Sequence, residues 1–184
     1  YKGNAQRIIL ASESAGANLA LSVALAARHD DVDNALAHEI YQLNPCIEAM
    51  MLGCGLFEVG RINRFKGKMP DVFLPVLEHI SETYLGPDCG DNVHRPLANA
   101  LSLLESDEEV RRPLPPAFVF CGGADPILDD SLRLASALKR RGVRASLRIY
   151  PERHHAFHAF VPLDVMARDC WHDQIDFLER VEST

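Results

Sequence analysis

Short apolar runs along this chain alternate with longer segments in which apolar residues recur at helical spacing. The strand-like runs cover residues 7–11, 47–54, 117–121 and 145–150. The helical segments cover residues 15–28, 130–141 and 163–181. Strands separated by helices pair in parallel through crossover connections. The pattern therefore predicts an α/β fold, built on a mostly parallel sheet with crossover helices.

The predicted helices differ in how their apolar residues are distributed. Residues 15–28 are apolar on nearly every side, as expected of a helix that packs in the interior against a sheet. Asp129 or Asp130 is a candidate N-cap for the second helix, and Gly142 is placed to end it. One face of the last helix collects the apolar side chains of Trp171, Ile175, Leu178 and Val181.

Residues 61–96 interrupt the alternation. A helical section near residues 73–84 lies in a stretch with four prolines, Pro70, Pro75, Pro87 and Pro96. We interpret this stretch as a lid-like insertion rather than a layer of the core. A chain of 184 residues can bury one sizeable core and is too short for two ordinary domains, so one domain over residues 1–184 is expected.

Composition and charge exclude several classes of protein. Hydrophobic residues make up 47% of the chain and charged residues 24%, which is typical of a globular protein. The formal charge of −7 argues against a nucleic-acid partner, which normally requires a basic surface. The five cysteines form no CxxC pair, so neither a zinc site nor a disulfide framework is indicated. With no signal peptide and no membrane span in the sequence, we expect a cytoplasmic protein.

The pentapeptide Ser12-Glu13-Ser14-Ala15-Gly16 lies between the first strand and the interior helix, where a nucleophile elbow belongs. Such a sharp turn needs small residues two positions before and after the nucleophile, and Ser12 and Gly16 meet this demand. The helix N-terminus behind Ser14 offers free N–H groups for a developing oxyanion. The alternative is that Ser12 or Ser14 is an ordinary N-cap.

Asp125 and His155 follow the third and fourth strands directly. Because the carboxyl ends of parallel strands share one edge of the sheet, both should lie near Ser14. The order Ser, Asp, His is the chain order of an α/β-hydrolase triad. Taken singly, Asp125 could be a helix cap or turn residue, and His155 a solvated loop residue.

Two neighbouring histidines compete with His155. His158 repeats the His-Ala-Phe motif and is the reserve candidate for the catalytic base. His154 and His158 would share one helical face, but no Glu follows His154, and Pro151 lies upstream, so an HExxH metal site is disfavoured. We therefore expect neither a metal nor a cofactor.

Several segments together resemble the hormone-sensitive-lipase-like esterases. Residues 14–20, SAGANLA, resemble that family's GDSAGGNLA elbow, and Asp125-Pro126 with Asp129-Asp130 looks like its DPLxDE segment. Leu114-Pro115-Pro116 and the pair Tyr150-Pro151 with His155-Ala156-Phe157 are similar to its Leu-Pro-Pro and YPGxxHGF segments. The resemblance implies a carboxylic ester hydrolase that forms an acyl-enzyme on a small-molecule ester. Its catalytic residues would be Ser14, Asp125 and His155, and the Ala15 N–H would serve the oxyanion hole.

The sequence departs from that family at several positions. Ser12 and Ala156 replace glycines, and Ala17 resembles the SAGAHLA form of kynurenine-formamidase-like enzymes, so an arylformamidase-like amidase is the alternative enzyme. A non-catalytic relative is the other alternative. The family's HGGG segment, which supplies oxyanion donors, lies well before the elbow, where this chain has thirteen residues. We therefore expect this chain to be the C-terminal part of an α/β-hydrolase fold, without the N-terminal portion. We also expect it to form a homo-oligomer or to associate with the missing N-terminal segment.

Overall fold

Four parallel strands form the central sheet. The structure is a computed structural model that describes residues 3–86, 96–160 and 163–183. The strands lie in the order β1-β2-β3-β4, and every pairing is parallel. Their bounds are β1 Ile8–Glu13, β2 Ile47–Gly53, β3 Ala117–Gly122 and β4 Ala145–Tyr150. The four strands predicted from the apolar runs are thus confirmed, as is the α/β class.

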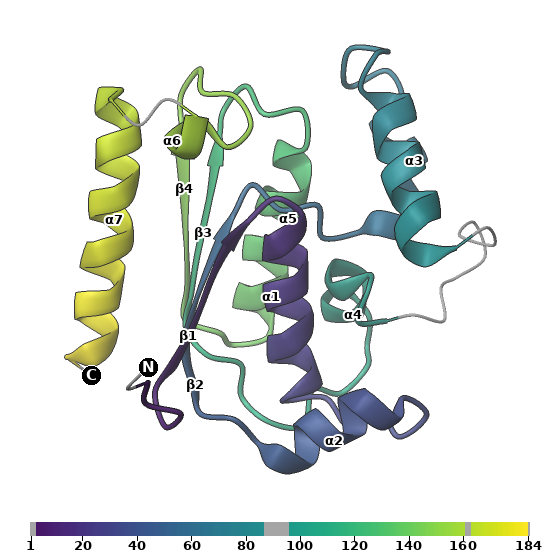
Figure 1. Cartoon of the computed structure of the whole chain (residues 1–184), viewed down its shortest axis with the longest axis vertical. Helices are drawn as coiled ribbons and strands as arrows, with labels where there is room; N and C mark the ends of the chain where they lie inside the picture. Colours follow the sequence, from purple (N-terminus) through teal and green to yellow (C-terminus); the bar gives the residue numbers. More distant parts are fainter. Residues whose placement is uncertain (1–2, 87–95, 161–162, 184) are drawn as a thin grey trace.

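Helices cover both faces of this sheet and make a three-layer structure (Figure 1). One face carries α1 (Ala15–Ala26), α4 (Ala100–Glu105) and α5 (Leu128–Arg140), and the other carries α7 (Val165–Glu182). The short helix α6 (Phe157–Phe160) follows β4, and α2 (Ala35–Leu43) lies beyond the N-terminal ends of the strands. The loops at the carboxyl ends of the strands therefore share the opposite end of the molecule.

The two faces of the sheet have separate hydrophobic cores. The α1 side is aliphatic, with Leu21 and Leu25 of α1 packed with Leu134 and Leu138 of α5. The α7 side is aromatic, and the rings of Phe118 and Phe177 stack with centroids 5.7 Å apart. Burial of apolar surface on both faces is what parallel strands require, because crossover helices leave neither face to water.

The buried face of α7 differs from the apolar face that the sequence predicts. Trp171 and Ile175 are 46% and 53% exposed. The buried positions form a neighbouring stripe, Ala167, Cys170, Gln174 and Phe177. Leu178 and Val181 remain partly buried beside that stripe. The face predicted to collect Trp171, Ile175, Leu178 and Val181 is therefore only partly buried.

The start of α5 also differs from expectation. Ile127 occupies the N-cap position, and neither Asp129 nor Asp130 does. The Asp130 carboxylate turns inward in the first helical turn, where it is fully buried. The predicted helix end is confirmed, since α5 stops at Arg140 and Gly142 takes a left-handed φ of 74°.

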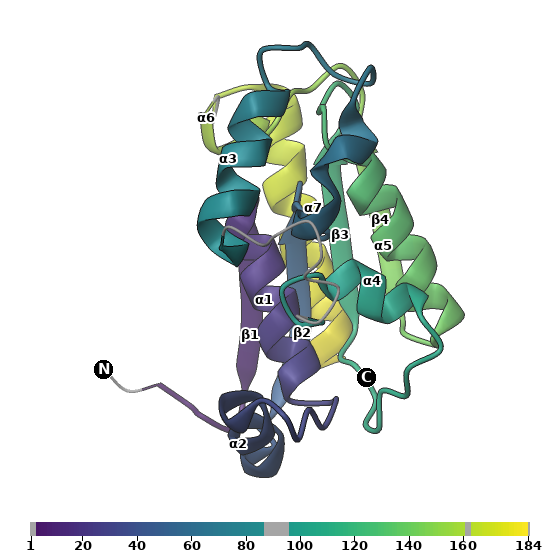
Figure 2. The same cartoon turned by 90° about the vertical axis from the view of Figure 1, so that its right-hand side faces the viewer.

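The segment after β2 departs from the strand–helix alternation. It contains a 3-10 helix, η1 (Val59–Phe65), and then α3 (Leu74–Leu85), which stands away from the sheet in Figure 1. Figure 2 views the protein from the side on which α3 lies. Ile62, Phe65 and Leu85 form a small hydrophobic cluster of their own with Ile127. Pro87 and Cys89 of the predicted insertion lie outside the described residues.

The sequence pattern missed α2 and α4. α2 has nine residues, with apolar side chains at helical spacing, yet only Ala37 is buried, and Leu36 and Leu43 are exposed. α4 has only six residues, and four of them are buried. Such a short segment shows a run of apolar residues but no helical period. Within the described residues, none of the helices has the length and apolar character needed to cross a membrane.

Candidate active site

Ser14 stands at a sharp turn between β1 and α1. Its φ of 54° and ψ of −127° are strained for a residue with a side chain. The turn is held because the Ser14 N–H donates to the carbonyl oxygen of Gly53 on β2, at 2.9 Å. A Cβ on Gly16 would collide with the Ser12 side chain, so the turn needs glycine there while Ser12 keeps this rotamer. This geometry is that of the predicted elbow.

The N-cap alternative for Ser14 does not hold. Ser14 occupies the N-cap position of α1, yet within the described structure its side chain makes no capping hydrogen bond. Ala15 is the first residue of α1, so its N–H lacks an acceptor within the helix and points out of the helix start beside Ser14. The side chain of Ser14 is thus available to a partner from another loop.

Asp125 lies in the turn between β3 and α5. Its Oδ1 accepts a hydrogen bond from the Ile127 N–H at 2.9 Å, which ties the carboxylate to the start of the helix. Its Oδ2 accepts from the Cys121 thiol at 3.4 Å and lies 2.9 Å from Nδ1 of His155. The turn interpretation of Asp125 therefore accounts for one oxygen, and the second faces the histidine.

His155 reaches the site because its loop lies directly on the end of β3. The Gly123 N–H donates to the Tyr150 carbonyl oxygen at 2.8 Å, and the Ala124 N–H donates to that of Arg153 at 2.9 Å. A Cβ on Gly122 would overlap the Arg153 carbonyl group. The glycine therefore permits the close approach that brings His155 beside Asp125.

The structure brings Ser14, Asp125 and His155 together across the sheet edge. Nε2 of His155 lies 2.8 Å from Oγ of Ser14, while Nδ1 faces Asp125. The hydrogen bond with Asp125, and next that with Cys54, raises the pKa of His155 to about 10, against an opposing effect of burial. One imidazole thus bridges a hydroxyl and a buried carboxylate, which is the arrangement that activates a serine.

The other two histidines are placed elsewhere. His154 is exposed. His158 is 4% exposed, and its Nε2 lies 2.7 Å from Oε2 of Glu13 rather than near Ser14. Burial lowers the pKa of His158, the charge of Glu13 opposes this, and the charge of His155 adds to the lowering. His158 therefore does not occupy the position of a base for Ser14.

Two cysteines that sequence analysis left without a role flank the site. Cys54 follows β2 directly, is buried, and adopts a left-handed φ of 37°. Ligand atoms of Cys54, Asp125 and His155 all lie within 4.8 Å of one another. Cys121 is buried on β3, and burial followed by the charge of Asp125 raises the pKa of its thiol, which therefore stays protonated. The positions of both thiols just after or within predicted strands were the signal available in the sequence.

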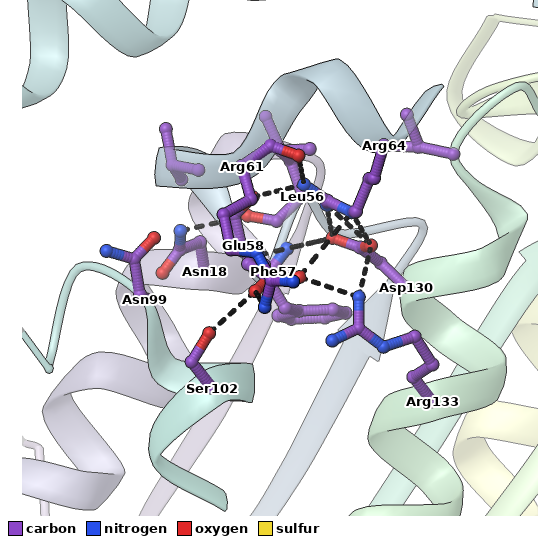
Figure 3. A network of polar contacts seen from close by, with 12 residues as sticks. Asn18, Leu56, Phe57, Glu58, Arg61, Arg64, Asn99, Ser102, Asp130 and Arg133 are labelled. Carbon is purple, nitrogen blue, oxygen red and sulfur yellow. Dashed lines mark hydrogen bonds and ion pairs between the residues drawn. The ribbon is translucent and has the colours of Figure 1, made fainter. Parts of the chain in front are cut away.

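A buried ionic network fixes the segment that follows β2 (Figure 3). The Asp130 carboxylate accepts hydrogen bonds from the Phe57 and Glu58 N–H groups at 2.8 and 3.2 Å. The Arg64 guanidinium donates to both Asp130 oxygens, at 2.6 and 2.7 Å. Burial raises the pKa of Asp130, although Arg64 opposes that shift. Helix α5 is thereby attached to the segment 57–64.

Glu58 forms the second half of this network. Its carboxylate accepts from Arg133 at 2.7 Å, from Ser102 at 2.8 Å and from Arg61 at 3.0 Å (Figure 3). Burial alone would raise the pKa of Glu58, but the bonds from Arg133 and Ser102 outweigh it and lower the pKa. The network lies beside the elbow helix, because Asn18 of α1 donates to the Leu56 carbonyl oxygen at 2.9 Å.

Comparison with known proteins identifies the family of the fold. The profile of the family described as alpha/beta hydrolase fold matches residues 1–159, most of the chain. The chain belongs to the α/β-hydrolase fold family. The α/β-hydrolase resemblance drawn from the sequence motifs is thereby confirmed.

Solved structures of similar fold include several esterases. An esterase from the bacterial hormone-sensitive lipase family matches with a TM-score of 0.74 and 24% identity, over 96% of this chain and 54% of that one. EstE5 soaked with p-nitrophenyl butyrate matches with a TM-score of 0.74 and 22% identity, over 98% and 55%. LipW from Mycobacterium marinum matches with a TM-score of 0.71 and 20% identity, over 98% and 52%. This α/β-hydrolase chain thus spans about half the length of these structures.

Proposed function

We propose that this chain carries the catalytic triad of a serine esterase of the hormone-sensitive-lipase-like type. The observation that carries the proposal is the single imidazole of His155, which lies 2.8 Å from Oγ of Ser14 and 2.9 Å from Oδ2 of Asp125. The strained elbow at Ser14 and the esterase neighbours of the same fold support it. The substrate class is a small carboxylic ester.

The proposed reaction passes through an acyl-enzyme. Nε2 of His155 takes the proton of Ser14 as Oγ attacks the ester carbonyl carbon, and Asp125 holds Nδ1–H and stabilises the imidazolium. The Ala15 N–H donates to the developing oxyanion. His155 then gives its proton to the leaving alcohol, and water attacks the acyl-enzyme by the same route in reverse. These steps use only groups of this chain and water.

The amidase and non-catalytic alternatives have less support. Ala17, the residue that resembles the formamidase-like form, is fully buried, so its methyl group fills the α1 core rather than contacting a substrate. A relative that had lost catalysis would have no requirement to keep three side chains from three loops within hydrogen-bond distance. We therefore favour ester hydrolysis.

We further propose roles for two peripheral features. α3 and the segment around it form a lid, supported by the exposed apolar side chains of Val76 and Ile80 on a helix that stands off the sheet.

Another polypeptide segment covers β1, which pairs only with β2 among the described residues and leaves its other edge free. That segment is either a second copy of the chain or an N-terminal segment outside these 184 residues. Light scattering on the 184-residue chain tests the second-copy version.

A fluorophosphonate probe tests the proposed nucleophile directly. We expect covalent labelling at Ser14, located by peptide mass spectrometry, and loss of labelling in Ser14→Ala. Ser12→Ala is the matched control, because it removes a hydroxyl two residues away and should still be labelled. p-Nitrophenyl butyrate hydrolysis provides the turnover measurement. Labelling at another residue, or equal labelling of Ser14→Ala, would refute the assignment.

A further inference from the structure

The thiol of Cys54 lies close to the acid and the base of the proposed triad. One ligand atom from each of Cys54, Asp125 and His155 lies within 4.8 Å of the other two. Thiolate, carboxylate and imidazole are the donors that zinc takes in proteins. Metal–ligand bonds of about 2.0–2.3 Å place tetrahedral ligand atoms roughly 3.5 Å apart, so closure requires shifts of about 1 Å.

We propose that Cys54, Asp125 and His155 form an inhibitory binding site for a thiophilic divalent cation such as Zn²⁺. Nδ1 of His155 is the ring nitrogen on the Asp125 side, at 2.9 Å, and would be the nitrogen ligand. The Cys54 thiol loses its proton to solvent on binding. A water molecule completes the tetrahedron, as in zinc sites with three protein ligands.

The surroundings of the three residues favour such a site. The Ile127 N–H holds Oδ1 of Asp125 at 2.9 Å, which orients the carboxylate as outer-shell hydrogen bonds do for metal ligands. The backbone of Cys54 is fixed because its N–H donates to the Phe120 carbonyl oxygen at 2.8 Å. The His155 side chain is 34% exposed, whereas that of Asp125 is fully buried, so an ion can enter from the histidine side.

Occupation of this site would stop the proposed reaction through the tautomer of His155. A cation on Nδ1 uses the lone pair there and leaves the proton on Nε2. Nε2–H then donates to Oγ of Ser14, 2.8 Å away, and no lone pair remains to accept the serine proton. The inhibition rests on the proposed esterase function, whereas the binding itself does not.

Cobalt substitution tests the binding without reference to activity. The 184-residue chain is titrated with Co²⁺ alone under a phosphine reductant, at mildly alkaline pH where protons compete less. We expect one cobalt per chain, a thiolate-to-cobalt charge-transfer band in the near ultraviolet, and displacement by Zn²⁺. Ser14→Ala should retain this band, because Ser14 is not a ligand. A spectrum without a charge-transfer band would overturn the proposal.

Variants identify the thiol. Cys54→Ala and Cys54→Gly should both lose the band and weaken binding by more than the roughly 10–100-fold that follows loss of an outer-shell partner. The glycine variant suits the left-handed φ of 37° and guards against misfolding of the alanine variant, with circular dichroism as the check. Cys46→Ser, which removes an exposed thiol, should bind as the parent does. A band that survives in both Cys54 variants, or is lost in Cys121→Ser, would contradict the ligand set.

Inhibition provides the second measurement. Zn²⁺ should inhibit probe labelling of Ser14 in the parent chain, and Cys54→Ala should resist the same Zn²⁺ concentration. Equal inhibition of both would refute the link between this site and catalysis. If the parent shows neither labelling nor turnover, the esterase proposal fails, and the cobalt spectra still decide whether the metal site exists.

Discussion

Nε2 of His158 lies 2.7 Å from Oε2 of Glu13, the residue directly before Ser14. The pair joins α6, which follows the His155 loop, to the elbow at the end of β1. His158 is buried, and its Nδ1 makes no hydrogen bond within the described structure. Its ring packs edge-on against three aromatic rings, those of Phe120, Phe157 and Trp171. The contacts of His158 are therefore those of a residue that holds the site together.

The three neighbouring histidines should separate by function. His155→Ala should lower ester hydrolysis by at least about 10³-fold, since it removes the proposed base. His158→Ala should retain much of the activity but destabilise the fold by about 2–4 kcal/mol, because it empties a buried aromatic site. His154→Ala should change neither, since His154 is exposed. Initial rates and urea unfolding of all three variants give the comparison. If His158→Ala were inactive yet fully stable, the base would be misassigned.

Gly122 should be the most sensitive glycine of the site. In Gly122→Ala, the new Cβ meets the backbone of Arg153, which cannot rotate away, and pushes the His155 loop off β3. We expect about 10²-fold lower activity, because displacement of a reacting group by about 1 Å has that effect. Gly123→Ala is the matched control. Its Cβ would meet backbone atoms at 3.3–3.4 Å, which small shifts accommodate. Equal loss in both variants would show that the close approach at Gly122 is not the cause.

Two arginines of the ionic network should differ sharply in their effect on stability. The Arg64 side chain is 13% exposed and pairs with the fully buried Asp130, so Arg64→Ala should destabilise the fold by about 3–5 kcal/mol. The Arg61 side chain also forms an ion pair, with Glu58, but is itself 73% exposed. Arg61→Ala should therefore lower the free energy of unfolding by about 0–1 kcal/mol. Urea unfolding at neutral pH measures both. Similar values for the two would mean that Asp130 finds another partner or water.

Ester hydrolysis should rise with pH through the alkaline range. Because the Asp125 bond raises the pKa of His155 to about 10, the neutral imidazole that accepts the Ser14 proton is the minor form at pH 7. Below that pKa, kcat/KM should increase about tenfold per pH unit. Cys54→Ala removes the second largest contribution to the raised pKa of His155. In that variant the increase of kcat/KM should therefore occur at lower pH. Rates corrected for spontaneous hydrolysis test this. A plateau already reached at pH 7 would contradict the raised pKa.

The sheet and the three loops of the candidate site could be predicted because their determinants are local. Apolar runs mark the buried parallel strands, and the carboxyl ends of such strands share one edge, so residues after β1, β3 and β4 were expected to meet. The proposed roles of Ser14, Asp125 and His155 remain predictions that the experiments above test.

The remaining features depend on contacts between distant parts of the chain. Asp130 looked like a helix cap, but Arg64, 66 residues away in sequence, draws its carboxylate inward. The buried stripe of α7 includes the polar Gln174, whose amide donates to the Cys170 carbonyl oxygen at 3.2 Å, whereas the larger apolar Trp171 is 46% exposed. Cys54 ends the run predicted as the second strand, so the shared-edge argument applied to it as well, but its thiol belongs to no motif that drew attention to it.

The partners of His155 lie at very different distances along the chain. Asp125 is 30 residues away, within the unit β3–α5–β4, whereas Ser14 is 141 residues away and reaches the histidine only across β2. The Asp–His pair depends on three consecutive elements, whereas its contact with the serine also requires β1 and β2 to be in place. Probe labelling of Ser14 is therefore also a conformational reporter. It would register the placement of β1 beside β2 as well as the unit β3–α5–β4, because the serine and the histidine lie on the first and last strands of the sheet.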